Sequence, residues 1–118
     1  MENNVVVEKS FQFSIRMVNL YKYLTKQKKE FILSKQVLKS GTSIGANVSE
    51  AVRGQSKADF TAKMSIALKE ASETDYWIRL LCATDYINAE QSESLLSDLA
   101  ELLSLLTAIC KTSSSVPN

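Results

Sequence analysis

The chain of 118 residues contains no histidine, one proline and three glycines. The lack of histidine excludes Ser-His-Asp and Cys-His catalysis in their usual forms, and it leaves an ordinary zinc site short of ligands. Pro117 lies next to the C-terminal residue, so no proline interrupts a helix inside the chain. Few glycines and prolines also leave little of the turn chemistry that β-hairpins need. These absences favour an all-α protein.

Cysteines are few and long apolar runs are missing. Cys82 and Cys110 lie on apolar helical stripes, where we expect free thiols in the core rather than a disulfide or a metal site. No run approaches the roughly 18 apolar residues of a membrane span, and the start of the chain does not resemble a secretory signal. We therefore expect a cytoplasmic protein with no membrane contact and no cofactor.

Charge is unevenly distributed, although the net charge is only +1. Residues 1–69 carry 12 Lys and Arg against 5 Asp and Glu, whereas residues 70–118 carry 2 against 8. Such an asymmetry is typical of a charged surface that meets a partner, or of complementary faces within an assembly.

Apolar spacing predicts four helices, over residues 10–26, 30–52, 57–86 and 89–111. The first carries two adjacent apolar stripes: Phe11, Ile15 and Val18, and then Phe13, Met17, Leu20 and Leu24. Together they form a wide apolar face. Short connections make neighbouring helices antiparallel, which predicts one domain, residues 1–118, with an antiparallel up-down-up-down four-helix bundle. We expect residues 1–9 and 112–118 to be extended or frayed.

Helix-end residues support these bounds. Ser56 with Asp59, and Asn88 with Gln91, have the spacing of capping boxes at the starts of the third and fourth helices. Gly54 stands just after the second helix, where we expect a left-handed C-cap.

The stretch SGTSIGANVSEAVRG, residues 40–54, holds every glycine of the chain. From Gly41 to Gly45 it has the G-x-S-x-G spacing of a hydrolase nucleophile elbow, but that motif needs a preceding strand and a histidine. It also lacks the Gly-Lys-Ser/Thr of a phosphate-binding loop. Its apolar positions step by four and three residues: Val37, Gly41, Ile44, Val48 and Ala51. We expect a helix in which Gly41 and Gly45 allow close packing, offsetting the cost of about 1 kcal/mol for an interior glycine.

A polar stripe follows the same helix: Gln36, Ser40, Ser43, Asn47 and Glu50. It is either a solvated face or a partly buried polar seam that faces another subunit or lines a channel. Glu70 and Glu73 of the third helix share one face, and we group them with Ser43, Asn47 and Glu50 as a candidate seam or oligomer interface.

Paired carboxylates can also act in acid–base catalysis or hold a metal. The di-iron arrangement of helical bundles, however, needs Glu-x-x-His. We therefore expect Glu70 and Glu73 to pair with Lys or Arg of an adjacent helix.

Lysines gather around the first helix junction: Lys22, Lys26, Lys28, Lys29, Lys35 and Lys39. Tyr21, Tyr23 and Phe31 are interleaved with them. Lysines that contact phosphates give sequence-independent, salt-sensitive binding of nucleic acid, and exposed aromatic rings stack on bases. The same lysines also fit a soluble helix end whose charge complements the helix dipole. Both interpretations stay open on composition alone.

Several of these stretches together resemble a known family, the bacterial four-helix-bundle proteins encoded in intervening sequences of 23S ribosomal RNA genes. The family pattern begins with Ser-Ile-x-x-Asn-Ile/Val-x-Glu, which is followed by a small residue and a glycine. A Ser-x-x-acid-Phe motif comes next, and a run rich in Ala and Glu follows it. The matching residues here are Ser43, Ile44, Asn47, Val48, Glu50, Ala51, Gly54, Ser56, Asp59, Phe60, Ala67, Glu70, Ala71 and Glu73. The likeness spans roughly residues 10–110. Lys35, Lys39 and Gly41 stand where the family often carries an arginine before the Ser-Ile step.

The resemblance implies an up-down four-helix bundle that forms a ring-shaped homopentamer and has no established enzymatic activity. In a related branch, such bundles serve the reverse transcriptases of diversity-generating retroelements, with a basic surface against RNA or the polymerase. We therefore expect a non-enzymatic homo-oligomer that associates with RNA or another nucleic acid through its lysines. The alternative is a protein–protein interaction module or accessory subunit, for example of a reverse transcriptase, without direct nucleic-acid contact.

Overall fold

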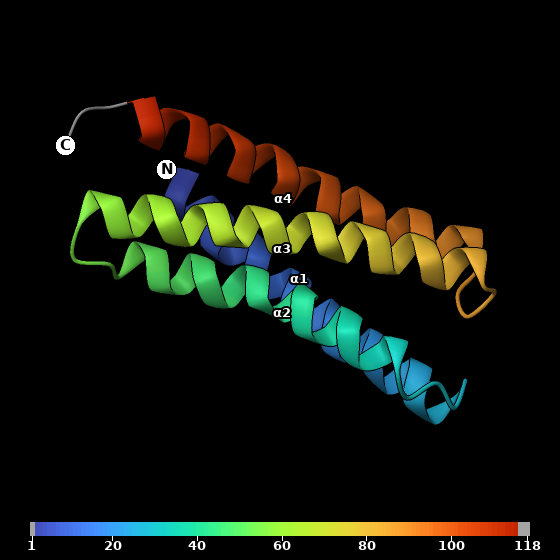
Figure 1. Cartoon of the computed structure of the whole chain (residues 1–118). Helices are drawn as coiled ribbons and strands as arrows, with labels where there is room; N and C mark the ends of the chain where they lie inside the picture. The colour runs from blue at the N-terminus through green and yellow to red at the C-terminus, as the bar shows by residue number, and fades with distance from the viewer. Residues whose placement is uncertain (1, 116–118) are drawn as a thin grey trace.

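A computed structural model describes residues 2–115, which form four α-helices and, within that range, no strand. The helices are α1 (Glu2–Lys26), α2 (Leu33–Val52), α3 (Lys57–Ala83) and α4 (Ala89–Ser115). Each packs against the next along the chain, and α4 returns to pack against α1 (Figure 1). The predicted up-down-up-down bundle is therefore confirmed. None of the described helices is long and apolar enough to cross a membrane.

The core lies between the four helices, and each helix contributes one buried stripe. Its largest fully buried side chains are Phe13, Met17, Leu24, Val37, Ile44, Met64, Ile78, Leu81, Leu99, Leu102 and Leu106, together with Val6. The cysteines, Cys82 and Cys110, are free and half-buried at the edge of this core. The leucine-rich stripe of α4 closes the bundle over α1 and α3, because its leucines recur at the spacing of one helix face.

Helices α1 and α2 approach each other closely at two glycines of α2, Gly41 and Gly45. A Cβ atom at Gly45 would lie 3.0 Å from Ser14 Oγ and 3.1 Å from the carbonyl oxygen of Ser10. A Cβ atom at Gly41 would overlap the side chain of Met17. Both glycines therefore face α1 of the same chain, where they allow close intrachain packing.

Helix α1 begins earlier than the sequence suggests, because residues 2–9 are helical rather than extended. Val6 is fully buried in the core, and Lys9 forms an ion pair with Glu101 of α4, with Nζ and Oε2 3.0 Å apart. Packing thus overrides the extended preference of the three consecutive valines. At the other end, α4 continues to Ser115, where the Ser113 and Thr61 hydroxyls are hydrogen-bonded. Residues 1 and 116–118 of the predicted frayed ends lie outside the described range.

Two predicted helix ends are shorter in the structure. Helix α2 starts at Leu33 instead of residue 30, because Glu30 caps it from the preceding turn. Helix α3 stops at Ala83 instead of residue 86. There Asp85 adopts a left-handed conformation (φ 68°), while the N–H of Tyr86 donates to the carbonyl of Leu81. This is the arrangement of a Schellman motif, which ends a helix.

The predicted left-handed C-cap at Gly54 is wrong, because no glycine has a positive φ. The chain instead leaves α2 through Arg53 (φ −101°, ψ 3°), and the N–H of Gly54 donates to the carbonyl of Ala51. A Cβ atom at Gly54 would overlap the carboxylate of Asp59, which would then have to move. Ser56 accepts a hydrogen bond from the N–H of Asp59, and Asn88 and Gln91 cap the start of α4 reciprocally.

The wide apolar face of α1 is only half covered. The stripe with Phe13, Met17, Leu20 and Leu24 is buried, but the adjacent stripe is not. Phe11, Ile15 and Val18 are 60%, 42% and 39% exposed. A helix in such a bundle is covered by two neighbours, which cannot enclose a face this wide.

We predict that Gly45→Leu destabilises the protein by about 2 kcal/mol, because the new side chain must enter the contact with Ser10 and Ser14. Urea unfolding followed by circular dichroism measures the change. Ala46→Leu is the matched control, since Ala46 is the next residue of α2 and is exposed. A Gly45→Leu protein as stable as the Ala46→Leu protein would contradict the close contact.

Candidate nucleic-acid interface

The structure brings the lysines of the first helix junction to one end of the bundle. Lys22 and Lys26 lie one turn apart on α1, and Lys35 and Lys39 lie one turn apart on α2, all four exposed. Lys28 and Lys29 occupy the turn between the helices, at the end of the bundle that also carries the α3–α4 turn (Figure 1). Within residues 2–115 none of these six lysines forms an ion pair. The end of the α1–α2 hairpin, defined by these lysines, is called the basic end below.

Glu30 organises the backbone of the basic end. One of its carboxylate oxygens accepts the N–H of Ser34 at 2.7 Å, and the other accepts the N–H of Leu33 at 3.0 Å. The N–H of Ile32 also points to this carboxylate, at 3.2 Å. These are N–H groups that the start of a helix leaves without partners. A carboxylate at this position is also favoured by the dipole of α2.

The pKa of Glu30 responds to two opposing effects. Burial of the side chain, which is 8% exposed, raises the pKa of the carboxyl group. The backbone hydrogen bonds from Leu33, Ser34 and Ile32 lower it, and together they hold the pKa below its ordinary value of 4.5. The charged form of Glu30 is therefore the form that the folded protein stabilises.

The aromatic residues of the basic end differ in their access to solvent. Phe31 is 54% exposed, whereas Tyr23 packs against the core and carries the Lys28 ammonium 5.9 Å from its ring centroid. Tyr21 is half-buried. Phe31 is therefore the aromatic side chain of this group that is best placed to stack on a base.

One carboxylate of the α3–α4 turn, that of Asp85, lies near the basic end. Asp85 and Lys28 line the same small hollow of about 170 Å³, beside Tyr23 and Tyr86. This contact between the two turns is not visible in the sequence, because it joins residues more than 50 positions apart.

The polar stripe of α2 divides between the protein interior and its surface. Ser40 is buried and accepts a hydrogen bond from the hydroxyl of Thr74 in α3, at 2.9 Å. Ser43 and Asn47 are half-buried, and each donates to the carbonyl group one turn earlier in α2. Glu50 is exposed and forms an ion pair with Lys63 of α3, at 3.0 Å. The stripe thus follows the boundary between α2 and α3.

The expected pairing of Glu70 and Glu73 with cations of an adjacent helix is not found in residues 2–115. Glu73 instead accepts a hydrogen bond from Trp77 Nε1 in the same helix, at 3.0 Å. Asp75 likewise pairs within α3, with Arg79. The described residues hold no group of three or more His, Cys, Asp or Glu that could bind a metal.

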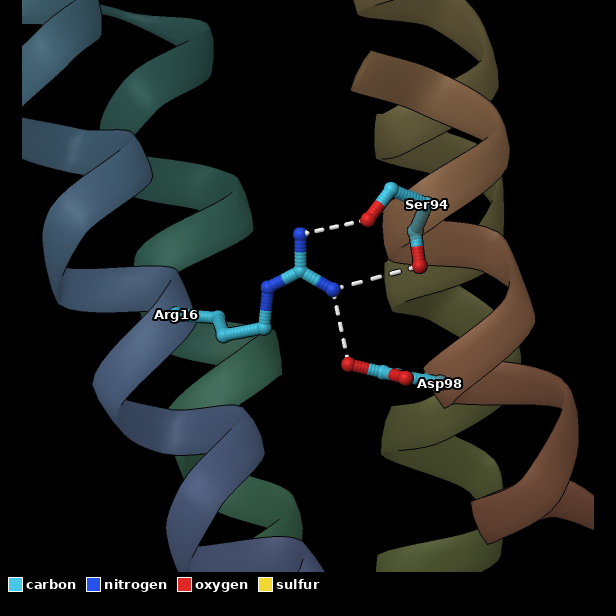
Figure 2. Close-up of polar contacts among 3 residues, drawn as sticks. All are labelled: Arg16, Ser94 and Asp98. Atoms are coloured by element: carbon cyan, nitrogen blue, oxygen red, sulfur yellow. Dashed lines mark hydrogen bonds and ion pairs between the residues drawn. The ribbon is translucent and has the colours of Figure 1, made fainter. Parts of the chain in front are cut away.

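Arg16 joins α1 to α4 in an arrangement that sequence reasoning missed. Its guanidinium donates to Asp98 Oδ2 at 2.7 Å, to Ser94 Oγ at 2.9 Å and to the Ser94 carbonyl at 3.2 Å (Figure 2). Together with the pair of Lys9 and Glu101, this clamp links α1 to α4 at two points along the antiparallel helices. The available sequence signal was the position of Arg16 at the edge of the buried stripe of α1.

A groove of about 550 Å³ runs beside this clamp, between α1 and the first half of α4. Leu20, Ile87 and Leu95 form its apolar part, and Asn19 and Gln91 are among its polar residues. Arg16 also lines the groove, but its guanidinium is already bound to Ser94 and Asp98. The groove therefore offers no free guanidinium to an anionic ligand.

Comparison with known proteins places this bundle in a family. The family model described as 23S rRNA-intervening sequence protein matches residues 2–108. The chain belongs to this family. No functionally curated protein matches this member of the 23S rRNA-intervening sequence family.

A solved structure supports the same assignment. It is a protein of unknown function from Bacteroides thetaiotaomicron, described as a member of the S23 ribosomal protein family. It is 56% identical to this chain, with a TM-score of 0.93, and the match covers 94% of this chain and 99% of the other. The two proteins therefore share the whole bundle.

We predict that Glu30→Gln lowers stability at pH 7 by about 1 kcal/mol, because a neutral amide is a weaker acceptor for the backbone N–H groups. The difference from the unsubstituted protein stays constant above the ordinary pKa of 4.5 and shrinks as the pH falls through the lower pKa of folded Glu30. Urea unfolding at pH 7, 5, 4 and 3 measures it. Glu8→Gln, at an exposed site on α1, is the control. A difference that is unchanged at pH 3 would contradict the role of the charge.

Proposed function

We propose that this member of the 23S rRNA-intervening sequence family is a non-catalytic bundle that assembles into a homopentamer and associates with RNA or another nucleic acid. The observation that carries the proposal is the basic end, where six lysines without ion pairs in the described structure gather on one hairpin. Lysines that meet phosphates release counterions, so such a surface binds nucleic acid without sequence preference.

The rigidity of the hairpin supports this role. Lys22 and Lys26 project from the last turns of α1, and Lys35 and Lys39 from the first turns of α2, so helical geometry spaces each pair. Glu30 holds the start of α2 through three backbone hydrogen bonds, which orders the turn between the pairs. Binding to phosphates then requires little ordering of the backbone.

A second candidate function is docking of a protein partner, as an accessory subunit. It is favoured by the boundary between α2 and α3, where Ser43 and Asn47 are half-buried beside the outer face of α3. Glu70 and Glu73 lie on that face without an ion pair in residues 2–115. Recovery of one protein partner after nuclease treatment, lost in Glu70→Lys and Glu73→Lys variants, would support this alternative.

We predict that binding to a structured RNA falls by about 10²–10³-fold between 50 and 200 mM salt, as expected for four to six phosphate contacts. Fluorescence anisotropy with a labelled RNA measures the affinity. Lys35→Glu combined with Lys39→Glu should weaken binding at least about tenfold at 50 mM salt, because each reversal removes a phosphate contact and adds repulsion. Lys57→Glu, at the opposite end of the bundle, is the control. Affinity that does not change with salt would rule out this mode of binding.

We predict that the purified protein has five times the chain mass of 13.1 kDa at micromolar concentration. Sedimentation equilibrium or light scattering measures this directly. A mass that stays at the monomer value over the whole micromolar range would overturn the proposed self-assembly, whatever the outcome with RNA.

A further inference from the structure

Helix α1 leaves three large apolar side chains in solvent along one face. Phe11, Ile15 and Val18 step by four and three residues, so they form a continuous ridge, called the α1 outer ridge below. Single exposed apolar residues are ordinary on a soluble protein. Three in a row on one helix face, with a phenylalanine 60% exposed, mark a contact surface.

Helix α4 carries a face of the opposite shape. Ser97, Ala100 and Ser104 are exposed on the side turned away from the buried Leu99 and Leu102, and they step by three and four residues. Side chains this small leave a shallow channel along the helix, into which a ridge of larger side chains can pack. These three residues are called the α4 outer channel below.

The ridge and the channel match in spacing and in charge when the two helices run antiparallel. Val18 then lies opposite Ser97, Ile15 opposite Ala100, and Phe11 opposite Ser104. The next residue outward on α1 is Lys22, and the next on α4 at the same spacing is Glu93. Within residues 2–115, neither Lys22 nor Glu93 has an ion-pair partner in its own chain.

A second charge pair extends this match. Lys26 lies one turn beyond Lys22, and Glu90 lies one turn before Glu93, so Glu90 falls within one residue of the position opposite Lys26 in the same register. The two lysines beyond the ridge face the two carboxylates beyond the channel only when the helices are antiparallel and aligned in this register. Reversing one helix would place the lysines opposite the end of the channel that lies toward the C-terminus of α4.

Symmetry makes the antiparallel register available to copies of this chain. Within one chain α1 and α4 are antiparallel, as the pairs Arg16–Asp98 and Lys9–Glu101 show. Rotation about an axis parallel to the bundle preserves helix directions, so α1 of one copy and α4 of the next are also antiparallel. Such a contact uses two different faces of the protein and can therefore close into a ring.

We propose that the α1 outer ridge packs into the α4 outer channel of a second copy of this chain, with Lys22 and Lys26 opposite Glu93 and Glu90 of that copy. The inference rests on the self-assembly proposed above and names the surfaces that carry it. It also divides the lysines of the basic end by role. Lys22 and Lys26 serve assembly, while Lys28, Lys29, Lys35 and Lys39 remain free for phosphates.

The first test compares two isoleucines of nearly equal exposure. Ile15 is 42% exposed on the ridge, and Ile66 is 44% exposed on α3. We predict that Ile15→Ser raises the concentration at which the assembly half-dissociates by about tenfold, because an apolar side chain is lost from each interface. Ile66→Ser should leave that concentration unchanged. Sedimentation velocity over a dilution series measures both, and circular dichroism checks that both variants remain folded.

The second test exchanges the charges. Lys22→Glu and Glu93→Lys should each weaken assembly, because each brings like charges together, and the combined variant should regain most of the loss. Both substitutions are at exposed positions, so the fold should tolerate them in all three variants. Failure of the combined variant to recover assembly would overturn the assigned register.

The outcomes separate this inference from the proposed self-assembly. If the unsubstituted protein is a monomer, both fail, and the ridge is left to a different partner. If it is an oligomer that Ile15→Ser and Ile66→Ser leave equally intact or weaken equally, self-assembly stands and the assigned surface is wrong. The inference is supported if Ile15→Ser weakens assembly, Ile66→Ser does not, and the variant with both charges exchanged recovers assembly.

Discussion

The close contact between α1 and α2 at Gly41 and Gly45 is the constraint on which the other features depend. It places the backbone of α1 against α2, with Met17, Ser14 and the carbonyl of Ser10 occupying the space of the missing side chains. This contact sets the rotation of α1 about its own axis. It thereby decides which stripe of α1 enters the core, which side reaches α4, and where Lys22 and Lys26 project.

The same rotation explains why α1 carries more apolar surface than its own bundle covers. With Met17 turned toward Gly41, the stripe of Phe13, Leu20 and Leu24 enters the core, and Arg16 reaches Ser94 and Asp98 on α4. Phe11, Ile15 and Val18 then fall on the remaining side. They cannot be buried by a small shift of α1, because such a shift would move Met17 away from the glycine and Arg16 away from α4. The exposed ridge is thus a consequence of well-determined packing and not of a loosely held helix.

The sequence predicts the four helices and their order well, because apolar spacing and capping residues such as Ser56 and Asn88 are local signals. It fails where a distant contact decides the outcome. The valines near the N-terminus are helical because Val6 enters the core, and the carboxylate of Asp59 occupies the space beside Gly54, neither of which a local pattern contains. The lysines of the basic end were found because they are close in sequence. The clamp of Arg16 and the nearness of Asp85 to Lys28 were missed, because each joins elements that only the folded bundle brings together.

The basic end keeps its positive charge because of how the one carboxylate within residues 22–39 is used. Glu30 could neutralise a neighbouring lysine, but its oxygens are directed at the N–H groups of Leu33, Ser34 and Ile32. The cations that form ion pairs, Lys9, Arg16, Lys63 and Arg79 in the described residues, all lie elsewhere in the chain. If these lysines only kept the protein soluble, ion pairs with carboxylates one turn away would make the helices more stable, because opposite charges at that spacing stabilise a helix. Lysines held unpaired on an ordered hairpin are instead available to phosphates and to the carboxylates of a neighbouring copy.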